Sequence, residues 1–147
     1  DLDRGHVVRL IARAMEWAGI TPACANQVFN IANGDVYLWE NVWPRLAELF
    51  GMDLAPPHPF SLARVMPQNG AVWDRVVQRY GLKPYAFEEI VPSWQFADFV
   101  FGHGARPNPH HMSTIKIRQF GFADCVDTED MFIELLAELQ RRRILPP

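Results

Sequence analysis

Few side chains in this chain have the type and setting to act as a nucleophile, an acid or a base. None of the three serines stands in a G-x-S-x-G turn, the setting that exposes a nucleophile in many hydrolases. None of the three tyrosines is followed four residues later by lysine, a spacing that helps tyrosine to donate a proton. Cys24 and Cys125 lie outside any C-x-x-C pair and outside the local signatures of nucleophilic cysteines. We therefore expect no catalytic residue on this chain.

Phosphate-binding and metal-binding patterns are also missing. The sequence has neither G-x-G-x-x-G nor G-x-x-x-x-G-K-[ST], so we expect no nucleotide cofactor to bind to this chain alone. His103, His110 and His111 form no i, i+4 pair, and no cysteine or carboxylate lies near them in the sequence, so no metal site is predicted. Their segment, Gly102–His111, holds two glycines and two prolines and is predicted to be a mobile loop.

The aromatic segment Trp94–Phe101 is the one stretch that suggests a binding surface. Its rings fall on more than one face of a predicted helix, which is more than a single core-facing stripe requires. Packing in the core accounts for most of these rings in one interpretation. In the other, rings beside a glycine- and proline-rich loop line an apolar ligand pocket.

Composition narrows the class of protein. A chain of 147 residues with 49% hydrophobic residues fits one folded domain. A net charge of −3 argues against nucleic acid or an anionic membrane as a partner, and no apolar run approaches the roughly 20 residues of a membrane span. Two cysteines favour buried thiols in a reducing compartment, so we expect a cytoplasmic protein. The chain opens without methionine and soon enters helical periodicity, and we expect a fragment.

Hydrophobic periodicity predicts about six helices and one or two strands, an α+β fragment that is mostly helical. The clearest helices cover 7–18, 71–80 and a last helix that begins at 127–130. Residues 28–32 are predicted to form a strand, and Asn33-Gly34 a turn after it. Residues 36–39 then form either a returning hairpin strand or the entry to a helix. A lone strand cannot satisfy its own backbone groups, so its sheet partner must lie outside the sequence or in another copy.

Several phrases, taken in order, resemble one family. They are Asn30–Val36, Trp39 with Trp43-Pro44, Val72-Trp73-Asp74 with Gly81-Leu82, Trp94–Asp98, Lys116 with Gly121-Phe122, and Ile144-Leu145-Pro146. Their order and spacing resemble the C-terminal part of the short-chain dehydrogenase/reductase group that contains progesterone 5β-reductase and iridoid synthase. Many bacterial relatives are called NAD-dependent epimerase/dehydratases. The resemblance runs from about Val7 to Pro147.

The resemblance implies how the chain fits into a longer enzyme. An N-terminal Rossmann domain, absent here, would bind NADPH and carry the catalytic tyrosine and lysine. Residues 1–147 would form the C-terminal substrate-binding region, in which the strand 28–32 and a helix 39–50 pack on that missing domain. The family also favours a turn at Asn33–Asp35 that leads into the helix, with a structural role rather than a chemical one.

The resemblance also implies a binding site. A phenylalanine in the family's W-x-F-x-D phrase lines the substrate pocket, and here that position is Phe96. Phe99 and His103 follow as weaker candidates, and no catalytic residue carries over. Gln95 stands where the plant enzymes have another aromatic residue, which implies a different substrate.

Three functions follow as hypotheses. The first is an NAD(P)H-dependent reductase that reduces the C=C bond of a small hydrophobic α,β-unsaturated carbonyl compound. The second is a sugar-nucleotide epimerase or dehydratase, although the aromatic segment offers few groups for a diphosphate. The third is a stand-alone binding module without catalytic activity. A homo-oligomer is also possible through the strand edge.

Overall fold

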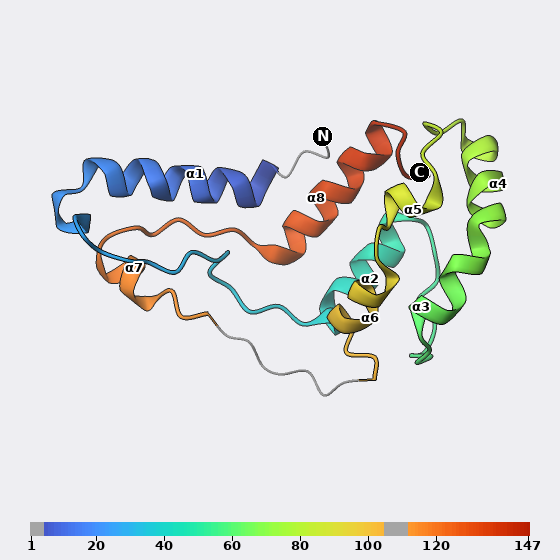
Figure 1. The fold of residues 1–147 in the computed structure, drawn as a ribbon, viewed down its shortest axis with the longest axis horizontal. Coiled ribbons are helices and arrows are strands. Elements are labelled where there is room, and N and C mark those ends of the chain that lie inside the picture. Colours follow the sequence, from blue (N-terminus) through green and yellow to red (C-terminus); the bar gives the residue numbers. More distant parts are fainter. Residues whose placement is uncertain (1–4, 105–111) are drawn as a thin grey trace. The chain divides into compact units, whose positions relative to one another are not determined.

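The computed structural model describes residues 5–104 and 112–147, and this part of the chain is mostly helical (Figure 1). The described residues form α1 (Gly5–Ile20), η1 (Pro22–Cys24), α2 (Trp39–Leu49), α3 (Leu62–Val65), η2 (Met66–Asn69), α4 (Gly70–Tyr80), α5 (Phe87–Ile90), α6 (Trp94–Val100), α7 (Ile115–Gln119) and α8 (Thr128–Arg141). The chain divides into two compact units. The first takes the described residues of Asp1–Val42 and His110–Glu134, and the second those of Trp43–Pro109 and Leu135–Pro147.

The core of the first unit lies against one face of α1. Leu10 and Ala14 are buried there with Ile117 of α7 and Phe122. Trp17 continues the same face one turn further on, because residues three or four apart lie side by side on a helix. The segments 28–33 and 122–127 run beside α1 in Figure 1 and contribute further apolar side chains to this core. The amphipathic helix predicted over 7–18 is therefore confirmed.

The β-strand predicted over 28–32 does not form in the described residues. Backbone-to-backbone hydrogen bonds within this part of the chain join no other segment to residues 28–32. The side chains still alternate, since Phe29 and Ile31 turn towards the core while Val28 is 82% exposed. A strand requires a neighbouring strand for its hydrogen bonds, and the described residues supply none. The prediction of one or two strands is thus wrong for this part of the chain, and the prediction of a mostly helical fold is confirmed.

The turn at Asn33–Asp35 anchors the start of α8. The carboxylate of Asp35 accepts hydrogen bonds from the backbone N–H and the hydroxyl of Thr128, both at 2.8 Å. The amide of Asn33 donates to the same hydroxyl at 2.9 Å, and Thr128 is buried. A carboxylate beside the first N–H groups of a helix satisfies donors that have no partner within the helix. The expectation of a structural role for this turn agrees with these contacts.

The helix predicted over 39–50 is confirmed as α2, and Pro44 lies within it. Residues 36–38 form neither a strand nor a helix, so the hairpin alternative is wrong. The assignment of residues 1–147 to one substrate-binding region stays a prediction. Cys24 is buried as expected, but Cys125 is exposed, because side chains alternate in the extended stretch before α8 and its neighbours Asp124 and Val126 take the more buried side.

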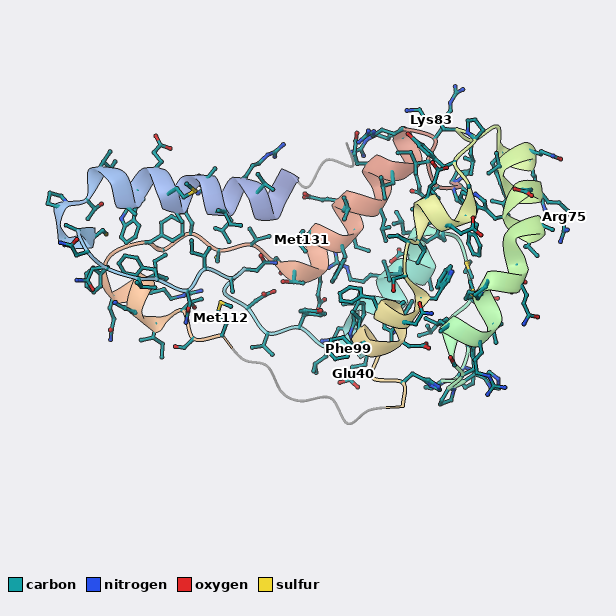
Figure 2. All side chains as sticks on the ribbon, viewed as in Figure 1. Glu40, Arg75, Lys83, Phe99, Met112 and Met131 are labelled. Atoms are coloured by element: carbon teal, nitrogen blue, oxygen red, sulfur yellow. The ribbon has the colours of Figure 1, made fainter. Side chains whose placement is uncertain are left out.

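The second unit is organised around an aromatic cluster. In this unit α3, η2 and α4 follow one another without a break, and α4 ends at Gly81 in the left-handed conformation. Trp73 of α4 is buried, stacks on Phe87 at 6.0 Å between ring centroids and donates from Nε1 to the carbonyl of Tyr85 at 2.8 Å. On the same helix, Arg75 points outward (Figure 2). The helix predicted over 71–80 is confirmed.

Candidate functional site

The candidate site is carried by α6, which begins at Trp94. Ser93 has an extended backbone, and its hydroxyl accepts a hydrogen bond from the N–H of Phe96 at 3.1 Å, so it caps the helix. The helix ends at Val100, and Gly102, two residues later, has a φ of +71°. These two signals explain why the aromatic segment forms a helix of only seven residues.

The helix brings two of the three predicted site residues together. The rings of Phe96 and Phe99 lie 6.3 Å apart, and the two residues are 65% and 64% exposed. Phe99 is labelled on α6 in Figure 2. His103 follows in the next turn, where it is exposed and its backbone N–H donates to the carbonyl of Asp98 at 2.8 Å. We call the two exposed rings the Phe96–Phe99 pair.

The opposite face of α6 packs into the second unit. The ring of Trp94 contacts Phe87 at 5.2 Å between centroids, and Phe87 in turn stacks on Trp73. Phe101, one residue beyond the helix, contacts Trp43 at 5.4 Å. The two interpretations of the aromatic segment therefore apply to different rings. Trp94 belongs to the aromatic cluster, whereas the Phe96–Phe99 pair stays outside it.

Asp98 connects α6 to the beginning of α3. Its carboxylate accepts hydrogen bonds from the hydroxyl of Ser61 at 2.8 Å and from the N–H groups of Leu62 at 2.7 Å and Ala63 at 3.2 Å. Partial desolvation acts to raise the pKa of Asp98. The three hydrogen bonds and the charge of His103 act in the other direction, and the net result is a pKa below the ordinary value of 3.8.

The sequence interpretation missed Asp98 as a candidate residue. The signal was present, because Asp98 follows Trp94 by four residues and so lies on the same helical face as a ring that packs inside. A carboxylate on a packed face needs hydrogen-bond donors. Which segment supplies those donors could not be predicted, because Ser61 and Asp98 are 37 residues apart in the chain.

Other features of the described residues do not form a second site. A hollow of about 10 Å³ between residues 31–32 and α7 in the first unit has room for about one water molecule, not a substrate. Within the described residues, no group of three histidine, cysteine or acidic side chains could hold a metal ion. His110 and His111 lie outside that part of the chain. None of the described helices is both long and apolar enough to cross a membrane.

Comparison with known proteins gives one consistent set of relatives, although no family model matches the chain. The (S)-8-oxocitronellyl enol synthase of Nepeta cataria is 32% identical over 141 residues. The enzymes of the same name from Camptotheca acuminata and Catharanthus roseus are 30% and 31% identical. Each match covers 93% of this chain but only 35% of the relative.

The chain thus spans about a third of the length of the relatives it matches. The matches extend over nearly the whole region in which the ordered phrases were found. They confirm the resemblance that those phrases indicated: over 93% of its length the chain is similar to part of the enol synthases of the iridoid synthase group.

Proposed function

We propose that the chain is the substrate-side part of an NAD(P)H-dependent reductase that reduces the C=C bond of a hydrophobic α,β-unsaturated carbonyl compound. The observation that carries the proposal is the similarity to three enol synthases along almost the entire chain. The outward-facing phenylalanines of α6 support it. The enzyme would be cytoplasmic, and a homo-oligomer is compatible with the proposal.

In this proposal the Phe96–Phe99 pair contacts the apolar part of the substrate. Two neighbouring rings that stay about two-thirds exposed offer an apolar contact surface, because burying such rings against a ligand is favourable. Contact with both rings would orient the substrate and exclude water from one side of it. His103 lies in the turn that follows the helix and would contact the substrate from there.

The reduction needs a hydride donor, and NAD(P)H would supply the hydride when bound. The residues of this chain do not fit such a cofactor, because the sequence has no glycine-rich phosphate loop. We assign the cofactor and the proton-donating groups to a Rossmann domain of a longer protein. The same domain would supply a sheet strand beside residues 28–32.

Phe96→Ala tests the proposed role of the ring in the longer protein. We expect kcat/KM for bulky, steroid-like enones to fall by about tenfold or more, because a large apolar contact is lost, with the affinity for NADPH unchanged. NADPH oxidation should be followed with small enones, bulky enones and nucleotide sugars. Tyr80→Ala is the control, because Tyr80 is a half-exposed aromatic residue at the end of α4.

The outcomes separate the functions. If the parent enzyme reduces enones and Phe96→Ala does so with the same kcat/KM, Phe96 is not part of the substrate site. Turnover confined to nucleotide sugars would favour an epimerase or dehydratase and return the rings of α6 to a structural role. If the protein turns over neither enones nor nucleotide sugars, the result favours the third hypothesis, a binding module without catalytic activity.

A further inference from the structure

The direction of the Phe96–Phe99 pair depends on how α6 is rotated about its axis. Trp94 and Asp98 are four residues apart and lie on the packed face, and Phe96 and Phe99 point to the other side. A rotation of the helix would therefore move both exposed rings together. Whatever holds the packed face sets where the rings point.

Of the two side chains on the packed face, Asp98 makes the directional contacts. Trp94 meets Phe87 through an apolar ring contact, which allows some sliding and rotation. The Asp98 carboxylate instead accepts three hydrogen bonds from consecutive residues of one segment, Ser61 to Ala63. Hydrogen bonds weaken steeply when their angles change, so three of them together restrict rotation.

The link joins two short helices. A helix of seven residues such as α6 is not stable in water by itself, and α3, with four residues, continues directly into η2 and α4. The N–H groups of Leu62 and Ala63, at the start of α3, have no acceptor inside their own helix, and Asp98 provides one. Ser61 adds a second cap, because its hydroxyl also accepts from the N–H of Arg64.

We propose that Asp98 is a positioning residue: by holding α6 against the start of α3, it sets the direction of the Phe96–Phe99 pair and so determines how bulky a substrate the enzyme accepts. The inference rests on the proposed function. Asp98 itself does not touch the substrate. Its effect is on selectivity, because a large substrate contacts both rings and a small one needs fewer of these contacts.

The test uses the longer reductase and compares Asp98→Asn and Asp98→Ala with the parent enzyme. Asparagine keeps one acceptor oxygen, and alanine keeps none. We expect kcat/KM for a bulky enone to fall by about tenfold in Asp98→Asn and further in Asp98→Ala. The loss should be in kcat more than in KM, because misplaced rings hold the substrate away from the reactive geometry. A small enone should lose less than about threefold.

Glu89→Gln is the matched control. Glu89 accepts a hydrogen bond from the N–H of Ala86 at the start of α5, another short helix of the same unit. The change replaces one carboxylate that caps a short helix and leaves the three hydrogen bonds of Asp98 intact. Its selectivity between bulky and small enones should equal that of the parent enzyme. An equal loss of selectivity in Glu89→Gln would overturn the inference, because any weakened cap would then have the same effect.

Ser61→Ala keeps the test decisive if the Asp98 variants do not fold. It removes one of the three hydrogen bonds to Asp98 together with the hydroxyl cap on the N–H of Arg64, and it leaves the two backbone bonds to Asp98, so a smaller shift in the same direction is expected. Unchanged selectivity in the folded variants overturns the role of Asp98 while leaving the reductase function intact. A parent enzyme that reduces no enone overturns the proposed function, and this inference with it.

Discussion

Asp98 and Phe96 are two residues apart, and their side chains point to opposite faces of α6. Asp98 is held by a hydroxyl and two backbone N–H groups, and its pKa is lowered despite partial desolvation. Phe96 is 65% exposed. The W-x-F-x-D phrase therefore combines a packing residue, an exposed residue and an anchoring residue within five positions.

The lowered pKa of Asp98 predicts a pH dependence of stability. The unfolded chain binds the proton more tightly than the folded chain, so ionised Asp98 stabilises the fold above its ordinary pKa of 3.8. This contribution is lost as pH falls through the lower, folded-state pKa. The free energy of unfolding, measured in urea, should therefore differ between the parent protein and Asp98→Asn by more at about pH 5 than below about pH 3.8. A difference that stays constant down to about pH 2.5 would show that the carboxylate is not preferentially ionised in the folded state.

At the scale of helices and turns, local signals predicted most of what forms. Periodic apolar residues predicted α1 and α4, because this signal acts within a few residues. The prediction of a strand over 28–32 was wrong because a strand needs hydrogen bonds from a neighbouring strand, which local sequence signals do not reveal. The division of rings in α6 also escaped prediction, since it depends on contacts of Trp94 with Phe87 and of Asp98 with Ser61.

Gly34 offers a test of the turn that anchors α8. Its φ is +96°, and a Cβ there would clash with Nη2 of Arg118, the group that donates to the carbonyl of Gly34 at 3.0 Å. We expect Gly34→Ala to lower the free energy of unfolding by about 1–3 kcal/mol, through backbone strain and the displaced arginine. Chemical denaturation of the purified protein measures the change.

The control for Gly34→Ala is Gly19→Ala in the same unit. Gly19 lies in α1 with open space around its Cα, so alanine should raise the free energy of unfolding by about 0.5–1 kcal/mol. Equal effects of the two substitutions would mean that the turn tolerates a side chain and does not hold the start of α8 by its backbone conformation.

At the scale of the whole molecule, each unit leaves large apolar side chains in solvent. In the first unit these include Met15 of α1, which is 68% exposed, and Val28 in the extended segment. In the second they include Met52 and Leu54, in the stretch between α2 and α3. The chain spans about a third of the relatives' length, so a longer protein containing it would have enough additional chain to cover such surfaces. This agrees with our proposal that residues 28–32 pair with a sheet outside the present sequence.

Amide hydrogen exchange tests whether residues 28–32 pair with a sheet strand in the longer protein. In the longer protein we expect the amides of residues 28–32 to exchange at least about tenfold more slowly than in the 147-residue chain, because strand pairing protects them. Leu10 and Ala14 are the internal reference, since both are buried within α1 and should be protected in each protein if the first unit is folded. Fast exchange of residues 28–32 in both proteins, with α1 protected in both, would exclude the sheet pairing. It would leave Lys116, which donates to the carbonyl of Val28 at 3.0 Å, among the contacts that hold the extended segment.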